Sequence, residues 1–264
     1  MPHDLTQLKH LLQNGAEALG IKLYVSGHRR NITIHRGFPK DMDPGFAPIY
    51  HQCQPYTMTS LERMYSLYQS IEYIIANNIP GDFVECGVWK GGSTMLIALT
   101  LLKHHISNRP IYLYDTFKGM TEPTKEDIRI SDNSPAHHTW RHQQHADHND
   151  YAYASLAEVK QNMQLTHYPD SYLVYVEGLV EHTLPASSPQ QISLLRLDTD
   201  WYKSTYHELV HLYPRLVTNG VLILDDYGHF AGARQAVNEY FSHQARPLLL
   251  HRVDYTGRVG IKTT

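Results

Sequence analysis

The feature that most constrains the fold of this chain is a regular alternation of short apolar runs with helical patterns from residue 83 onward. Short apolar runs between turn residues predict buried strands, and apolar residues that recur about every 3.6 positions predict helices. The predicted strands are 83–86, 111–114, 172–176, 192–197, 221–224, 247–253 and 258–262, and the predicted helices are 91–105, 156–163, 203–213 and 231–243. This order predicts an α/β fold in which right-handed crossovers build a mostly parallel sheet with helices on both faces.

The last two apolar runs are joined by Asp254-Tyr255-Thr256-Gly257, which has the composition of a hairpin turn. A hairpin reverses the direction of the chain, so the second of its strands runs against the first. We therefore expect a seven-stranded sheet that contains one antiparallel strand.

The chain before the alternation shows weaker patterns. Residues 4–19 predict a short amphipathic helix, and residues 25–58 show no clear period and predict an irregular segment. A firm helix then begins at Thr59 or Ser60, either of which can cap it. We expect the region 1–58 to serve substrate binding or oligomer contacts.

A single large domain is expected over 59–264, interrupted by a polar insertion over 117–152. The insertion is longer than ordinary connections between helices and strands, which favours a lid over the site.

Composition narrows the function. The net charge is −3 with histidine neutral, so nucleic acid and anionic membranes are not expected partners. The apolar run 95–102 is too short to cross a bilayer, and the first residues lack the pattern of a signal peptide. The only cysteines, Cys53 and Cys86, form no C-x-x-C motif. These features predict a cytoplasmic protein.

Four aspartates follow two of the predicted strands. Asp198 and Asp200 come after the run that ends at Leu197, and Asp225 and Asp226 come after the run that ends at Leu224. The carboxyl ends of parallel strands meet at one edge of a sheet, where ligands bind. Carboxylates gathered there repel each other unless a positive group lies among them, and a hard divalent cation with oxygen ligands is the natural one. The alternative is that they are ordinary polar residues at strand ends.

The first predicted strand leads into a glycine-containing turn, and Glu85 lies just before it. Gly87, Gly91 and Gly92 permit a tight turn and a close approach of the backbone to a ligand. The turn lacks the G-x-G-x-x-G pattern of dinucleotide sites, and Glu85 would repel a pyrophosphate. A carboxylate there suits a cationic ammonium group, which S-adenosylmethionine carries. A plain strand-to-helix turn is the alternative.

Asp115 follows the second predicted strand. An acidic residue at this point of a β-α-β unit can accept hydrogen bonds from both ribose hydroxyls of a nucleoside. The alternative is a capping role for the segment that follows.

Four segments together resemble the macrocin O-methyltransferase family, which includes sugar methyltransferases of macrolide and aminocoumarin antibiotic biosynthesis. They are ECGVWKGGS at 85–93, YDTFKGM at 114–120, RLDTDWY at 196–202 and LDDYG at 224–228. The resemblance extends over roughly residues 55–262. It implies a Rossmann-like class I methyltransferase, usually oligomeric, that uses S-adenosylmethionine and Mg²⁺, with Mn²⁺ possible on ligand chemistry.

The resemblance also implies roles for particular residues. Asp198, Asp225 and Asp226 would be the metal ligands, and Asp200 the general base. In some members a histidine of the insertion is the base instead. The candidates here are His137, His138, His142 and His145, and we take His142 as the predicted one. The cofactor would be held by Glu85, Gly87, Ser93, Thr94, Asp115, Phe117 and Gly178.

The insertion carries a cluster of histidines between 137 and 148. Such a cluster can bind a soft metal. The alternative is a solvated loop whose histidines change charge at about pH 6.

Coordination to a dication lowers the pKa of an oxygen and fixes it in place, and a carboxylate can then take the proton. A vicinal diol offers two such oxygens, so we expect a glycosylated small molecule with adjacent hydroxyls as substrate. A polysaccharide or a non-sugar polyol is an alternative acceptor, and a metal-dependent hydrolase is an alternative enzyme. A non-enzymatic interaction protein and a nicotinamide oxidoreductase fit the residues less well.

Overall fold

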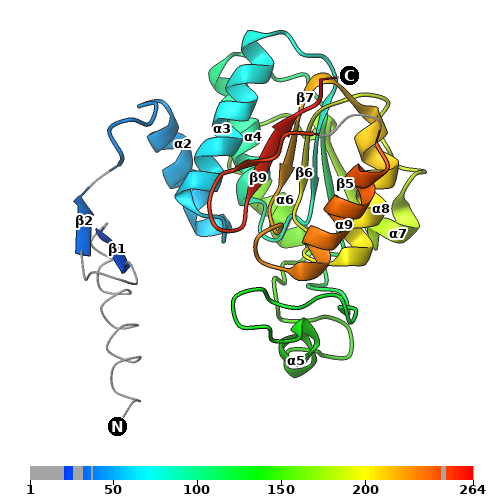
Figure 1. The fold of residues 1–264 in the computed structure, drawn as a ribbon. Helices are drawn as coiled ribbons and strands as arrows, with labels where there is room; N and C mark the ends of the chain where they lie inside the picture. Colours follow the sequence, from blue (N-terminus) through cyan, green and yellow to red (C-terminus); the bar gives the residue numbers. More distant parts are fainter. Residues whose placement is uncertain (1–20, 26–31, 37, 245–247, 264) are drawn as a thin grey trace. The chain divides into compact units, whose positions relative to one another are not determined.

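The computed structural model describes residues 21–25, 32–36, 38–244 and 248–263 (Figure 1). It divides the chain into two compact units, residues 1–48 and residues 49–264. The helix expected at 4–19 lies outside the described residues. The expected boundary at residue 58 stays a prediction.

The second unit is built on a seven-stranded sheet. The strand order is β5 (Leu173–Glu177), β4 (Ile111–Asp115), β3 (Asp82–Cys86), β6 (Ile192–Leu197), β7 (Leu216–Leu224), β9 (Arg258–Ile261) and β8 (His251–Arg252). The strands from β5 to β7 pair in parallel, and β9 pairs antiparallel with both β7 and β8. The predicted mostly parallel sheet with one antiparallel strand is confirmed.

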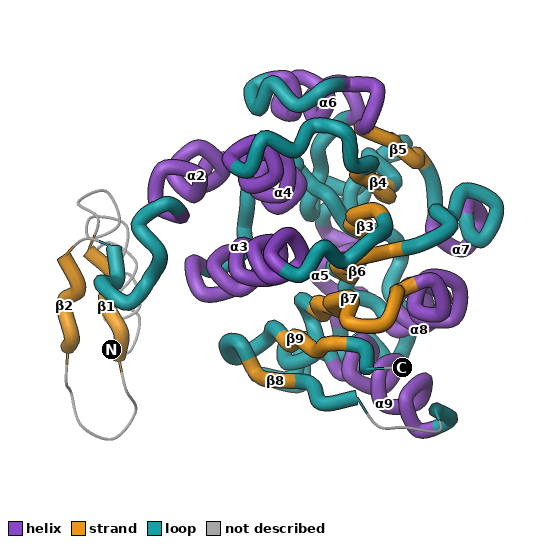
Figure 2. The backbone as a smooth tube through the Cα atoms, turned by 90° about the horizontal axis from the view of Figure 1, so that it is seen from above, coloured by secondary structure: helices purple, strands orange, loops and turns teal. Residues whose placement is uncertain are grey.

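Helices cover both faces of this sheet, as predicted (Figure 2). One face carries α3 (Leu61–Ala76), α4 (Gly92–Lys103) and α6 (Leu156–Gln164), and the other carries α7 (Val180–Thr183), α8 (Tyr202–Leu212) and α9 (Ala231–Ser242). All six residues of β6 are buried, which is the pattern of a strand covered on both sides. Ser60 caps α3, because its Oγ accepts a hydrogen bond from the backbone N–H of Arg63 at 3.2 Å.

The strand order reverses between β3 and β6. From β3 the chain builds outward through β4 to β5, and from β6 it builds the other way to β7. The carboxyl ends of β3 and β6 therefore open a crevice, the usual ligand position in such sheets. Gly87 lies at this point with φ of +82°, and a Cβ there would come within 1.9 Å of the Asp198 carbonyl oxygen. Only glycine fits this close approach.

The prediction that residues 25–58 form an irregular segment is wrong. It contains β2 (Ile32–Arg36), which pairs antiparallel with β1 (Ile21–Val25), and α2 (Phe46–Cys53), followed by the 3₁₀ turn Gln54–Tyr56. A helical period is present in α2, because its buried residues lie three and four positions apart. They are Phe46, Ile49, Tyr50 and Cys53.

Three smaller differences concern element ends and the insertion. β7 begins at Leu216 rather than at 221, and the strand predicted over 247–253 is only the two residues of β8. The insertion 117–152 contains a helix, α5 (Ala136–His142), and lies beyond the main body of the sheet (Figure 1). In the described part of the chain, every helix is too short or too polar to traverse a bilayer.

Candidate active site at the carboxyl edge of the sheet

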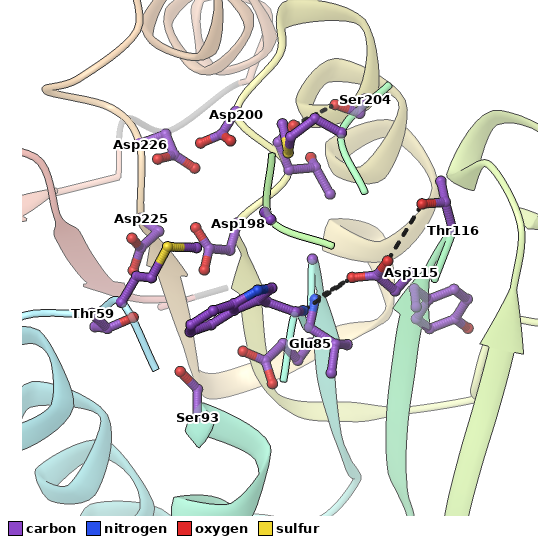
Figure 3. A pocket seen from close by; sticks show the side chains of 18 of the residues that line it. Thr59, Glu85, Ser93, Asp115, Thr116, Asp198, Asp200, Ser204, Asp225 and Asp226 are labelled. Carbon is purple, nitrogen blue, oxygen red and sulfur yellow. Dashed lines mark hydrogen bonds between the residues drawn. The ribbon is translucent and has the colours of Figure 1, made fainter. Parts of the chain in front are cut away.

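A cavity opens where β3 and β6 end, and most of the predicted site residues line it (Figure 3). The insertion contributes to its wall through residues 119–121, Tyr151 and Ala152. The predicted residues that line this cavity are Glu85, Gly87, Ser93, Asp115, Gly178, Asp198, Asp200, Asp225 and Asp226.

Three predicted site residues are not among those that line it. Thr94 is buried behind Glu85 and donates a hydrogen bond to Glu85 Oε2, and Phe117 is buried with its backbone N–H bound to Asp115. His142 is exposed on α5, where its Nε2 lies 3.4 Å from Nε2 of His138. The structure therefore does not bring His142 to the aspartates.

The four aspartates meet at one side of the cavity, as the strand ends predicted (Figure 3). Carboxylate oxygens of Asp198, Asp200 and Asp226 lie within 4.8 Å of one another. Asp200 adopts a left-handed backbone conformation with φ of +65°, which a non-glycine residue keeps only where surrounding structure holds it. This backbone turn directs the side chain of Asp200 toward Asp226 (Figure 3).

Asp225 is held differently, by two arginines. Its Oδ1 accepts a hydrogen bond from Arg196 Nη2 at 2.6 Å, and its Oδ2 accepts one from Arg63 Nη1. Both oxygens are thus already bound to guanidinium groups. The predicted metal ligands were Asp198, Asp225 and Asp226. The three carboxylates that lie close together in the structure are Asp198, Asp200 and Asp226.

Arg196 is the centre of this arrangement. Its side chain is 2% exposed, and it also donates to Glu85 Oε1 at 2.7 Å and to Asp198 Oδ2 at 2.7 Å. One guanidinium therefore binds an acid of β3 and the acids that directly follow β6 and β7. A buried arginine stays charged, and partners of this kind offset the cost of removing its charge from water.

The charges in this part of the described structure do not balance. Two arginines, Arg63 and Arg196, contact or adjoin six carboxylates, which are Glu85, Asp198, Asp200, Asp225, Asp226 and Asp254. Burial, and then the neighbouring acids, raise the pKa of Asp200 to about 7 and raise the pKa of Asp226 well above its usual range. The group needs protons or a further cation to be stable near neutral pH.

Glu85 does not present a free carboxylate in this structure. Arg196 and Thr94 bind its two oxygens, and burial raises its pKa to about 7 despite the guanidinium. The turn after it is built as predicted: Gly91 caps α4 with φ of +91°, and Ser93 lies in the first turn of that helix.

Asp115 binds backbone groups with both oxygens. Its Oδ2 accepts from the N–H groups of Val88 at 2.7 Å and Trp89 at 3.2 Å, and its Oδ1 accepts from that of Phe117 at 2.7 Å. Asp115 thus fixes the glycine turn and the start of the insertion while it lines the cavity. Its proposed contact with a ribose stays a prediction.

Arg63, Arg196 and His229 are among the residues of the cavity region that were not identified from the sequence. Arg63 and His229 both line the cavity, and Arg196 pairs with its acids. For Arg196 a signal was present, because an arginine inside a predominantly apolar, buried strand requires a buried partner. His229 is held by a 3.3 Å contact of Nδ1 with the Tyr255 hydroxyl, and burial lowers its pKa.

The chain is similar to a known family and to several of its characterised relatives. The family described as macrocin-O-methyltransferase (TylF) matches residues 47–259. Demethyldecarbamoylnovobiocin O-methyltransferase of Streptomyces niveus is 32% identical over 70% of this chain and 67% of its own length. A tetracenomycin-C 4'-O-methyltransferase of Streptomyces olivaceus, whose name specifies a dimethoxy-rhamnosyl substrate, is 30% identical over 85% of this chain and 82% of its own length.

Solved structures give the same fold. The O-methyltransferase NovP superposes with a TM-score of 0.69 at 30% identity and covers 79% of this chain and 83% of its own. The calicheamicin methyltransferase CalS11, at 15% identity, superposes with a TM-score of 0.58 over 86% of this chain and 98% of its own, which supports the fold alone.

Proposed function

The chain belongs to the macrocin O-methyltransferase family and is an S-adenosylmethionine-dependent O-methyltransferase, and we propose that its acceptor is a sugar hydroxyl of a glycosylated small molecule. One observation carries the proposal: a group of acids and the glycine turn after β3 share a single cavity at the switch point of the sheet. The rhamnosyl substrate named for the Streptomyces olivaceus relative supports a sugar acceptor.

The turn after β3 is our proposed cofactor site. The cofactor supplies an electrophilic methyl group on a sulfonium. The proposed binding residues are Glu85, Gly87, Ser93, Thr94, Asp115, Phe117 and Gly178. Thr94 and Phe117 would act by holding Glu85 and Asp115, since those are the contacts they make.

We propose that Asp198 and Asp226 hold a divalent cation, with Mg²⁺ preferred for an all-oxygen site and Mn²⁺ as an alternative. The residues fit a cation, because the acids of the cavity outnumber its arginines and three of them already gather within 4.8 Å. Bound there, the ion would lower the pKa of an acceptor hydroxyl. The third ligand is Asp200 if the arginine pairs of Asp225 persist, and Asp225 if Arg63 releases it.

The proton of the acceptor hydroxyl needs a base, and the cavity offers two. Asp200 is our proposed base if it is not a metal ligand, and His229 is the base if it is. His229 suits this role, because its lowered pKa keeps the imidazole neutral and able to accept a proton. We assign no role to His142, which lies outside the cavity.

The wall formed by the insertion gives the protein a way to align the acceptor. Residues 119–121 and Tyr151 line the same cavity as the aspartates. A bound sugar with adjacent hydroxyls would be oriented between these walls, and orientation of this kind lowers a transfer barrier by several kcal/mol, about 7 in favourable cases.

Calorimetry with S-adenosylhomocysteine and then Mg²⁺ tests the proposal. Wild type should bind both, and Asp226→Asn should keep the first and lose the second. Asp200→Asn identifies the third ligand, because loss of cation binding makes Asp200 a ligand, whereas retained binding with lost turnover makes it the base. Failure to bind S-adenosylhomocysteine would overturn the cofactor site. Turnover with diol-bearing sugars, and its loss with monodeoxy analogues, tests the acceptor class.

Polysaccharide and non-sugar polyols are tested in the same acceptor panel. We further propose that the chain forms a homo-oligomer and acts in antibiotic biosynthesis. Light scattering on the purified protein tests the first of these.

A further inference from the structure

A second set of potential metal ligands lies in the insertion, apart from the aspartates. Residues 145–148 form a tight turn, in which the backbone N–H of His145 donates to the carbonyl of His148 at 2.8 Å. An antiparallel bridge between Gln144 and Asn149 closes the turn. The turn stacks the two imidazole rings, whose centroids lie 4.7 Å apart at an angle of 11°.

Asp150 joins these two histidines. His145 Nε2 lies 2.8 Å from Asp150 Oδ2, and His148 Nε2 lies 3.2 Å from Asp150 Oδ1. One ligand atom from each residue falls within 4.8 Å of the others. We propose that His145, His148 and Asp150 form a site for a divalent transition-metal ion such as Zn²⁺.

The distances from the two histidines to Asp150 require little rearrangement. Zinc binds imidazole nitrogen and carboxylate oxygen at about 2.0–2.2 Å, so tetrahedral ligands lie about 3.4 Å apart. The observed separations of 2.8 and 3.2 Å need to increase by less than about 1 Å. Three protein ligands are the number found in zinc sites with one exchangeable position.

The histidine orientation provides independent support. Nδ1 of His148 lies 2.8 Å from Asp147 Oδ1, which leaves Nε2 directed at Asp150. A carboxylate on the far nitrogen is the usual partner of a metal-bound histidine, because it fixes the tautomer and raises the basicity of the ligand. The His148 ring also packs on Tyr153, with centroids 4.6 Å apart.

The base of the turn is anchored in the protein. Asn149 is 1% exposed, its backbone N–H donates to the Lys118 carbonyl at 2.8 Å, and its side chain donates to the Trp140 carbonyl at 2.9 Å. The exposed His145 and the partly buried His148 are therefore carried by a fixed support. A preformed ligand set loses less conformational entropy on binding than a free loop.

The chemistry of this set differs from that of the aspartates. Imidazole suits zinc, copper, nickel and iron, whereas Mg²⁺ takes oxygen ligands. Asp147, His148 and Asn149 also line a second cavity beside the first, together with Trp140 and Trp201. A metal ion here would fix one rim of that cavity. The ion site itself does not depend on the proposed acceptor.

Zinc titration of the chelator-stripped full chain tests the proposal, with excess Mg²⁺ present to occupy oxygen sites. We expect His145→Ala and His148→Ala each to bind one Zn²⁺ fewer per chain than wild type. Asp147→Asn keeps all three ligands and should bind roughly 10- to 100-fold more weakly. His138→Ala is the matched control, since His138 and His142 form another close histidine pair within the insertion, and it should bind like wild type.

Hydrogen exchange gives a second readout. Zinc should slow exchange over 143–150 in wild type and in His138→Ala, and leave it unchanged in His148→Ala. Equal zinc binding by all variants would overturn the proposal, as would loss of binding in His138→Ala alone. Circular dichroism shows whether each variant is folded. If a histidine variant does not fold, the weaker zinc binding expected of Asp147→Asn still tests the proposal.

Discussion

Replacement of Arg196 by methionine is the most direct test of how the acid group is held together. The substitution keeps most of the side-chain length and removes the charge. It leaves Glu85, Asp198 and Asp225 without the guanidinium that now lies 2.6–2.7 Å from each.

The magnitude follows from the contacts. Three hydrogen bonds to charged groups, at about 1.5–3 kcal/mol each, give a gross loss of about 5–9 kcal/mol. The side chain of Asp198 is 25% exposed, so water replaces its partner in part, whereas Glu85 and Asp225 are 1% and 4% exposed. The two buried partners alone give about 3–6 kcal/mol, close to the about 3–5 kcal/mol typical of a broken buried ion pair.

Urea unfolding near pH 7 measures this loss, with Arg215→Met as the control. Arg215 binds only backbone carbonyls in the contacts described for it, those of His211 and Pro189, and should cost much less. The deficit of Arg196→Met should shrink as the pH falls from about 7 toward about 5. In the variant, the buried acids that lost the guanidinium bind protons more readily in the folded chain than in the unfolded chain. The free energy of unfolding of the variant therefore rises as the pH falls. A deficit within about 1 kcal/mol of the control would refute the reasoning.

Three further outcomes are expected. Gly87→Ala should abolish S-adenosylhomocysteine binding, since its Cβ would lie 1.9 Å from the Asp198 carbonyl oxygen; unchanged calorimetric affinity would contradict this. Ser60→Ala should lower the free energy of unfolding by about 1–2 kcal/mol, because it removes the cap of α3 and a 2.8 Å hydrogen bond to Asp254; an unchanged urea midpoint would argue against it. Arg63→Met should strengthen Mg²⁺ binding several-fold if Asp225 is the third ligand, and leave it unchanged if Asp200 is; weaker binding would contradict both assignments.

The arrangement of strands and helices was largely determined by the sequence. Apolar periodicity is a local property, and burial of the last part of β7 leaves the continuous apolar run 221–224, which is visible without a structure. The same local logic limited the cap of α3 to Thr59 or Ser60, of which Ser60 is the cap, and placed the four aspartates at strand ends. It failed for α2, where the apolar positions have helical spacing within a segment rich in turn residues.

Only the tertiary structure decided which groups pair. Arg196 contacts an acid of β3 and the acids that directly follow β6 and β7, and these strands become neighbours through crossovers that no local pattern specifies. Likewise, Asp225 and Asp226 are adjacent in sequence, yet the first faces two arginines and the second faces Asp200. Side chains alternate in direction along an extended backbone, so neighbouring residues meet different partners. The sequence therefore supplied the charges at this edge of the sheet, and the packing of distant elements decided how each one is balanced.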